Sequence, residues 1–238
     1  MTAYDPLVLD IETAPDPAAV ERLLASPPKF EPRANLRDPA KIEADLVAKR
    51  AKWLRDTTDG AGLSPLTGRV VCVGTEGNDP DEPAHAATLA SHGDEEGLLR
   101  SVALRLASTS QIVTFNGWAF DAPYLRIRML RHGVMIPQCL LPGPRYRVVP
   151  HLDLRMVLTD WDSRARGRLG DWCRLLTGAE PDDVEHPTEP RFVSGADVAA
   201  LVADGSTAAW DAIADHCESD VHATWAMWQR LIGTGMLG

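Results

Sequence analysis

The sequence predicts an α/β fold in which helices cover both faces of a central sheet. Short apolar runs of strand length, such as residues 7–13, 70–75 and 112–115, recur between longer segments whose apolar residues have helical spacing. The content of 45% hydrophobic and 24% charged residues is ordinary for a globular protein, and 238 residues suffice for one large domain or two small ones.

The N-terminal elements are defined by apolar runs and by the prolines between them. Residues 7–13 predict a buried strand, and residues 14–28 predict a short helix that ends at two prolines. Asp38 is expected to cap a second helix, with Pro39 at its first position. That helix should end near Arg55 and precede a loop at 56–62, a strand at 70–75, an acidic turn at 76–83 and a strand at 84–90.

The C-terminal elements are marked by glycine and proline at their ends. Four apolar residues at helical spacing predict a helix over 95–106. A strand over 112–115 should end at an Asn-Gly pair, and Pro123 and Gly133 should open and close the next helix. The remaining expected elements are a strand at 151–158, a helix at 169–176, a Pro-rich acidic loop at 179–192 and a long helix at 207–232.

Charge is unevenly distributed along an acidic chain. The net charge is −10, yet residues 29–55 hold eight basic against four acidic side chains, a net of +4. Residues 126–168 hold nine arginines against three acids, a net of +6. Such segregation is typical of a phosphate-contacting surface on an acidic protein, and ordinary solvated helix faces are the alternative interpretation.

The lack of a recognisable targeting signal and the spacing of the cysteines both favour a cytoplasmic protein. The N-terminus has no basic region followed by an apolar stretch, and no apolar run approaches the ~20 residues of a membrane span. The four cysteines, Cys72, Cys139, Cys173 and Cys217, form no C-x-x-C pair. We therefore expect buried, reduced thiols in a cytoplasmic protein that has no membrane partner.

Two carboxylates lie in the first apolar run, where a core segment should carry no charge. Asp10 and Glu12 are two positions apart, so they share one face of a strand while Leu9 and Ile11 fill the other. This spacing lets both carboxylates bind one cation from a rigid element. The alternative is a strand whose polar edge faces solvent.

Two further carboxylates lie at helix positions. Asp121 directly precedes the helix opened by Pro123, where it can also serve as a helix cap. Asp220 lies at the margin of the apolar stripe of the last helix, and pairing with an arginine is its alternative role. Asp215 and His222 are expected to point away from this stripe. Because a bound cation compensates buried carboxylates, four that converge predict a two-metal site for phosphoryl transfer.

Three segments resemble the exonuclease motifs of the DEDD superfamily, which comprises the proofreading-type 3′-5′ exonucleases with an RNase H-like fold. They are Asp-Ile-Glu-Thr at 10–13, Phe-Asn-Gly-Trp-Ala-Phe-Asp-Ala-Pro-Tyr-Leu at 115–125 and His-Cys-Glu-Ser-Asp-Val at 216–221. The chain is most similar to the exonuclease domain of family B DNA polymerases and to its free-standing phage and bacterial relatives. Residues 63–74 and 194–198 also resemble this group, so the resemblance covers essentially the whole chain.

The resemblance implies a fold and an activity. The fold is a central mixed five-stranded sheet flanked by helices, in a single exonuclease domain over 1–238 with a helical insertion at about 29–62. The activity is hydrolysis of phosphodiester bonds at DNA 3′ ends, with release of nucleoside monophosphates. The partner is a single-stranded or frayed nucleic-acid end.

The resemblance also implies roles for individual residues. Four carboxylates would hold two Mg²⁺ or Mn²⁺ ions about 3.5–4 Å apart and act in catalysis. Three further residues fall where relatives contact the terminal nucleotide. The four implied ligands are Asp10, Glu12, Asp121 and Asp220, and the three implied substrate contacts are Thr13, Asn116 and Phe120.

The third motif departs from the family pattern. One branch of the family has a Tyr four residues before the final Asp, and the other has a His five residues before it. Here His216 lies four residues before Asp220, so a histidine occupies the tyrosine position. His216 is a candidate general base. Its alternatives are to orient the attacking water or to be an ordinary helix residue.

Several questions about the nucleic-acid partner stay open at this point. Both basic windows could flank the path of a single strand, and Trp53, Trp118 and Trp161 are candidate stacking surfaces, although large aromatics are more often core residues. RNA is an alternative substrate because no motif reports contacts to a 2′-hydroxyl. A catalytically idle nucleic-acid-binding or polymerase-docking module is the alternative from another class, and a polymerase or replication partner is left open.

Overall fold

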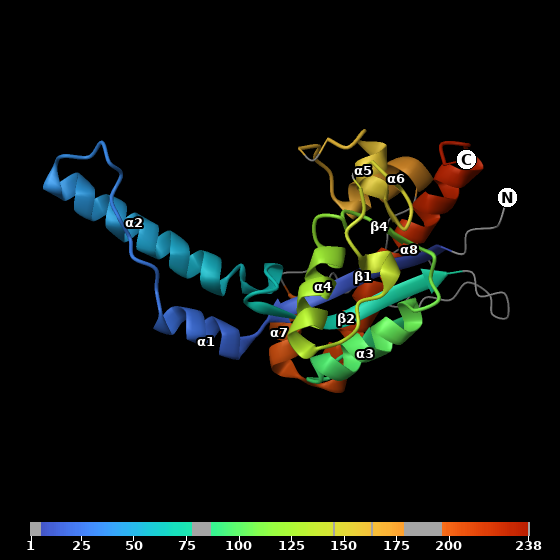
Figure 1. The fold of residues 1–238 in the computed structure, drawn as a ribbon, viewed down its shortest axis with the longest axis horizontal. Coiled ribbons are helices and arrows are strands. Elements are labelled where there is room, and N and C mark those ends of the chain that lie inside the picture. Colours follow the sequence, from blue (N-terminus) through green and yellow to red (C-terminus); the bar gives the residue numbers. More distant parts are fainter. Residues whose placement is uncertain (1–5, 78–86, 145, 163, 179–196, 238) are drawn as a thin grey trace. The chain divides into compact units, whose positions relative to one another are not determined.

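A computed structural model describes residues 6–77, 87–144, 146–162, 164–178 and 197–237 (Figure 1). The chain divides into two compact units, one formed by Met1–Glu12 with Val70–Gly238 and the other by Thr13–Arg69. The expected loop at 179–192 and most of the expected turn at 76–83 lie outside the described residues. No helix in the described part of the chain has the length and apolar character needed to cross a membrane.

The centre of the fold is a five-stranded sheet. Its strands are β1 (Pro6–Pro15), β2 (Gly68–Gly77), β3 (Ala87–Ala90), β4 (Gln111–Thr114) and β5 (His151–Asp153). The strand order is β3-β2-β1-β4-β5. β4 pairs in parallel with both β1 and β5, whereas β2 and β3 are antiparallel. The prediction of a mixed five-stranded sheet is therefore confirmed.

Eight α-helices are described, and most begin and end close to the predicted residues. One expected element is wrong in part: only His151–Asp153 of the segment 151–158 is a strand, because the Asp153 carboxylate accepts the Met156 N–H at 3.2 Å and so starts a helix. The helix over Val198–Asp204 was not predicted. The helices are α1 (Pro17–Ala25), α2 (Pro39–Thr58), α3 (Glu95–Leu106), α4 (Asp121–His132), α5 (Leu154–Leu158), α6 (Leu169–Thr177), α7 (Val198–Asp204) and α8 (Thr207–Gly233).

Each face of the sheet packs against its own helices (Figure 1). Leu7, Leu9 and Ile11 of β1 join a core that contains apolar side chains of α3 and α4. Val8, which points the opposite way, joins a second core with apolar side chains of α6 and α8. Because side chains alternate along a strand, the carboxylates at even positions of β1 lie on the face that α8 covers.

Gly74 lets α8 lie close to β2. A Cβ atom at Gly74 would come within 2.7 Å of Val221 Cγ2 and 3.0 Å of Cys217 Sγ, both on α8. Such separations are too short for carbon and sulfur atoms, so glycine is required for this approach. The close packing holds α8 against the sheet beside β1.

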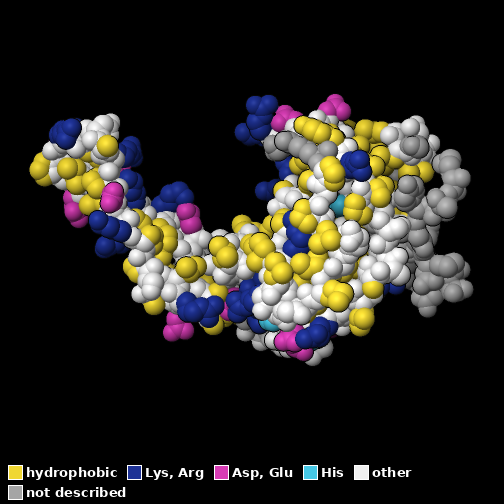
Figure 2. Space-filling view, viewed as in Figure 1, with side chains coloured by type: hydrophobic (Ala, Val, Ile, Leu, Met, Phe, Trp, Pro, Cys, Tyr) yellow, Lys and Arg dark blue, Asp and Glu magenta, His cyan; other side chains and the backbone are white. Residues whose placement is uncertain are grey.

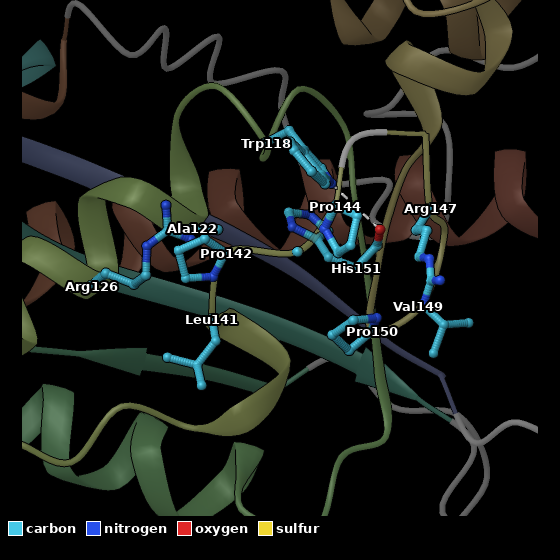
Figure 3. A pocket seen from close by; sticks show the side chains of 11 residues that line it. Trp118, Ala122, Arg126, Leu141, Pro142, Pro144, Arg147, Val149, Pro150 and His151 are labelled. Carbon is cyan, nitrogen blue, oxygen red and sulfur yellow. Dashed lines mark hydrogen bonds between the residues drawn. The ribbon is translucent and has the colours of Figure 1, made fainter.

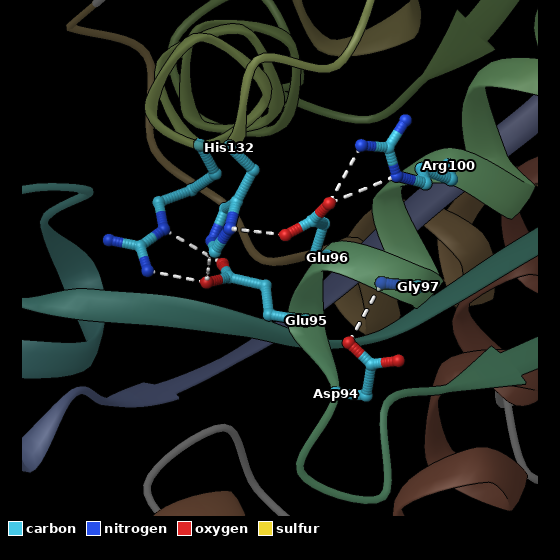
Figure 4. A network of polar contacts seen from close by, with 7 residues as sticks. Asp94, Glu95, Glu96, Gly97, Arg100 and His132 are labelled. Atoms are coloured by element: carbon cyan, nitrogen blue, oxygen red, sulfur yellow. Dashed lines mark hydrogen bonds and ion pairs between the residues drawn. The ribbon is translucent and has the colours of Figure 1, made fainter.

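Glu95 ties α3 to α4 and β2 through a buried ion pair (Figure 4). Its Oε1 accepts hydrogen bonds from Arg128 Nε and from the Val70 N–H, each at 2.8 Å. Its Oε2 contacts Arg128 Nη2 and lies 2.9 Å from His132 Nε2. Burial opposes ionisation of Glu95, but the hydrogen bonds from Arg128, Val70 and His132 outweigh it and lower the pKa of the carboxyl. Arg128 is only 1% exposed, so this arginine of the basic window is structural.

The unit Thr13–Arg69 contains α1 and α2, and Figure 2 shows Lys and Arg side chains along it. Asp38 caps α2 as predicted, accepting the Ala40 N–H at 3.0 Å. Part of the basic charge is paired within the unit, since Arg33 and Lys49 both lie against the buried carboxylate of Asp45. Trp53 packs edge-to-face on Phe30, with 5.9 Å between ring centroids.

Candidate active site

The four predicted carboxylates come from three elements and interact electrostatically beside β1, although Asp121 belongs to neither of the two close groups described below. Asp10 and Glu12 are on β1, Asp121 is the first residue of α4, and Asp220 is on α8. Carboxylate oxygens of Glu12 and Asp220 and a ring nitrogen of His216 all lie within 4.8 Å of one another. A second group with the same spacing contains Asp10, Glu12 and Cys217. Glu12 belongs to both groups and therefore connects them.

Burial and mutual repulsion disfavour the charged forms of these carboxylates. Burial raises the pKa of Asp10 well above its usual range, and Asp121, Asp220 and Glu12 raise it further. Burial also raises the pKa of Glu12, with Asp220 the next cause. These groups gain most from a nearby positive charge, because like charges cannot all ionise at short range without compensation.

Asp121 shows the same effect, with Asp153 and Asp220 as the repelling carboxylates. Burial raises the pKa of this carboxyl to about 7, against hydrogen bonds from its own backbone N–H and that of Ile11. Asp121 is the first residue of α4, and the cap position belongs to Phe120, so the cap role considered for this carboxylate is wrong. A set of oxygen donors that repel one another fits a hard divalent cation such as Mg²⁺ or Mn²⁺.

His216 reaches the carboxylate cluster from α8. Its Nε2 lies 3.5 Å from Glu12 Oε1, and its side chain is 21% exposed. The other branch of the family has its histidine five residues before the final Asp. That position is Asp215 in this chain, and Asp215 is exposed to solvent. His216 therefore lies where a proton acceptor can contact both the carboxylates and incoming water.

Cys217 is a neighbour of the cluster that the motif comparison missed. Its Sγ lies 3.8 Å from the backbone oxygen of Asp10 and 3.9 Å from Asp10 Oδ2. A hydrogen bond with Cys72 and burial both raise the pKa of this thiol well above its usual value. The neutral thiol thus donates toward Asp10. The sequence feature that could have identified Cys217 was its position between His216 and Asp220 on the apolar stripe of the last helix.

Asp153 is a second missed residue, at the end of β5. It is 0% exposed, and its carboxylate accepts the backbone N–H groups of Asn116 and Trp118, each at 3.0 Å. Burial raises the pKa of Asp153, while these backbone hydrogen bonds oppose the rise. Asp153 therefore holds the turn that leads from β4 to Asp121.

The three predicted substrate contacts lie close to the carboxylates in the sequence. Thr13 directly follows Glu12 in β1, and Phe120 directly precedes Asp121. Asn116 has a left-handed backbone with φ 69°, and its side-chain oxygen accepts a hydrogen bond from Arg155 Nη1 at 2.6 Å. Their contacts to a nucleotide stay predictions.

His222, which was expected to point away from the apolar stripe of α8, contacts the neighbouring strand β2. Its Nδ1 lies 2.8 Å from Oε2 of Glu76, a buried residue of β2, and its Nε2 lies 3.5 Å from Glu218 Oε1. The hydrogen bond with Glu76 raises the pKa of His222 against the effect of burial. A helical wheel missed this pair because it does not include the neighbouring strand.

Comparisons with known proteins identify the family and the fold. No curated protein matches the chain. A family model described as "Predicted 3'-5' exonuclease related to the exonuclease domain of PolB" matches residues 67–235. This span includes Asp121, His216 and Asp220, while Asp10 and Glu12 precede it.

The structure of the family B DNA polymerase from the hyperthermophilic archaeon Pyrobaculum calidifontis is similar, with a TM-score of 0.59 and 15% sequence identity. The match covers 96% of this chain but only 24% of the polymerase chain, and it supports the RNase H-like fold. Because the family model matches more than half of the sequence, this chain belongs to the family of predicted 3′-5′ exonucleases related to the exonuclease domain of PolB.

Proposed function

We propose that this protein is a metal-dependent 3′-5′ exonuclease that hydrolyses phosphodiester bonds at DNA 3′ ends and releases nucleoside monophosphates. The observation that carries the proposal is the repulsion within a group of carboxylates: burial and mutual repulsion, including repulsion by Asp220, raise the pKa values of Asp10, Glu12 and Asp121. Such a set is costly in a folded protein unless it binds cations. Membership of the exonuclease family supports the same activity.

The proposed ligands of two Mg²⁺ or Mn²⁺ ions are Asp10, Glu12, Asp121 and Asp220. When bound, the cations would activate the attacking water and stabilise the leaving 3′ oxygen of an in-line displacement. Asp10 and Glu12 provide a rigid pair because both are on one strand. Asp121 and Asp220 complete the set from two helices that pack on opposite faces of the sheet.

His216 is the proposed acceptor of the water proton. A neutral imidazole accepts at one ring nitrogen, and Nε2 faces the cluster at 3.5 Å from Glu12 Oε1. In the step, the water oxygen bonds to phosphorus, the bond from phosphorus to the 3′ oxygen breaks, and the water proton moves to His216. The leaving 3′ oxygen then takes a proton from solvent, and the strand is one nucleotide shorter.

DNA is the proposed substrate, as a single-stranded or frayed 3′ end, and RNA is the alternative. The preference rests on membership of a family related to the exonuclease domain of a DNA polymerase. The proposal requires no polymerase partner and places the protein in the cytoplasm. It includes exposed basic residues such as Arg147 as contacts to backbone phosphates.

The test is digestion of end-labelled strands with Mg²⁺, with Mn²⁺ and with chelator. A strand labelled at its 5′ end should shorten stepwise, and a label at the 3′ terminal nucleotide should appear at once as mononucleotide. Asp220→Ala protein, purified in parallel, controls for contaminating nucleases. Release from the 5′ end, internal cutting or activity in chelator would reject the proposal. Faster digestion of RNA would establish the alternative substrate, and binding without digestion would establish an idle module.

A further inference from the structure

We propose that a pocket beside α4 binds one internal nucleotide of the substrate strand, upstream of the nucleotide being removed (Figure 3). This proposal rests on the proposed function. The pocket is formed by Ala122 and Arg126 of α4, the segment that follows this helix and the start of β5. The residues that the argument uses are Trp118, Ala122, Arg126, Arg147, Pro150 and His151.

The pocket and the candidate active site both include residues at the start of α4. Ala122 follows Asp121 directly, and Trp118 lies in the turn that precedes it. The Trp118 backbone N–H is held by Asp153 at 3.0 Å, and its indole N–H donates to the His151 oxygen at 3.4 Å. A strand whose 3′ end lies at the carboxylates must pass the residues that surround them. The pocket is therefore placed to contact the same strand further from its end.

The walls of the pocket offer flat, uncharged surfaces. Trp118 and His151 are stacked, with ring centroids 6.0 Å apart, and proline rings form much of the remaining wall. Burial lowers the pKa of His151 to about 3, so its ring is neutral at physiological pH. Nucleobases pack on such flat surfaces without regard to sequence, because every base has a π face.

The charges at the pocket favour an anionic ligand. Arg126 and Arg147 lie on different sides of it (Figure 3), and none of the described residues that line it is acidic. Arg126 Nη1 donates to the Leu140 oxygen at 2.7 Å, which fixes that guanidinium, while Arg147 is exposed. Flat walls between two guanidinium groups match a base with its flanking phosphates. An acidic peptide would use the charges but not the flat walls.

The experiment measures binding of 5′-labelled single-stranded oligodeoxynucleotides by fluorescence anisotropy, in chelator so that no digestion occurs. Each oligonucleotide has one abasic position, moved stepwise from the 3′ end. The native protein should lose affinity, by roughly 10-fold, when the abasic position falls at one internal register. An affinity that is independent of the abasic position beyond the 3′ terminal nucleotides would overturn the proposal.

A matched pair of variants tests the charge. Arg147→Glu should weaken binding of the intact strand by roughly 10-fold and lower the salt dependence, whereas Arg105→Glu, the same change at an exposed position of α3, should do neither. Equal effects of the two variants would reject the pocket. So would a preference of the native protein for an acidic peptide that Arg147→Glu removes. The binding measurement needs no turnover, so it is independent of the digestion assay. Digestion of end-labelled DNA without register-dependent binding would reject the pocket alone, and register-dependent binding without digestion would reject the proposed reaction alone.

Discussion

Asp153 Oδ1 accepts the backbone N–H of Asn116 at 3.0 Å, although the two residues are 37 positions apart. Asn116 has a left-handed backbone, which costs a non-glycine residue of order 1 kcal/mol or more unless its surroundings hold it. The contact therefore joins the end of β5 to the turn that positions Asp121. A buried carboxylate outside the metal cluster thus supports the geometry of one inside it.

Asp153→Asn should lower turnover without abolishing it. The amide keeps the size of the side chain but replaces one acceptor oxygen with a donor, so one of the N–H groups of Asn116 and Trp118 loses its partner. Because small displacements of catalytic groups are costly, we expect a loss on the order of 10²-fold in kcat with KM nearly unchanged. Single-turnover digestion of 5′-labelled DNA measures it. Asp162→Asn, at an exposed acid of the same region, is the control and should retain full activity.

Stability of the metal-free protein should fall as pH rises. The pKa of Asp121 is raised in the folded protein to about 7 from an ordinary 3.8, so its contribution is fully present below pH ~4 and is lost as pH rises through about 7. Asp121→Asn should therefore stabilise the metal-free protein at pH 8 more than at pH 5. The check is the difference in Tm between variant and native protein across that range, in chelator. A difference that does not grow with pH would contradict the account of the cluster.

Divalent cations should reverse this loss of stability. Binding to the folded state alone raises Tm, and deprotonation of the ligands releases protons. The Tm increase on adding Mg²⁺ or Mn²⁺ should be present in native protein and in Asp215→Asn, and absent in Asp121→Asn.

His216→Ala should reduce turnover by about 10²–10⁴-fold, the usual contribution of a positioned acid–base group. His216→Tyr should retain part of the activity, because a tyrosine can orient the attacking water. The measurement is single-turnover digestion of 5′-labelled DNA by the three proteins at saturating metal. Full turnover of the Ala variant would show His216 to be an ordinary helix residue.

Glu95→Gln should destabilise the fold far more than it affects catalysis. It removes the negative charge that pairs with Arg128, which is 1% exposed, at a cost of about 3–5 kcal/mol of unfolding free energy. The folded pKa of Glu95 is lowered, so its contribution is present above its unfolded pKa and is lost as pH falls through the folded value. Denaturant unfolding at neutral and acidic pH measures both effects. Glu96→Gln breaks an exposed pair with Arg100 and should cost less than about 1 kcal/mol.

The elements that have a local sequence signal were predicted. Alternation along β1 placed Asp10 and Glu12 on one face, and helical spacing placed Asp220 toward the interior beside exposed Asp215. Asp38 and the proline after it marked the start of α2. Each of these features depends on residues within a few positions of one another. Periodicity and capping report such features directly.

The features that were missed depend on partners distant in the sequence. Asp153 receives N–H groups from residues 35 and 37 positions earlier, and His222 meets Glu76 146 positions away. Neither residue type nor spacing indicates such a partner as long as the pairing of the strands is unknown. The same holds for β5, whose strand ends at Asp153 because that residue caps a helix.

The most direct test of the account is the effect of single carboxylate substitutions on Mg²⁺-dependent digestion from the 3′ end. Asp10→Ala, Glu12→Ala, Asp121→Ala and Asp220→Ala should each abolish release of mononucleotide from end-labelled DNA, while each variant stays folded and Asp215→Ala keeps native turnover. Because all four carboxylates are assigned to the same two cations, near-native turnover in two or more of these variants would contradict the two-metal site and with it the proposed reaction.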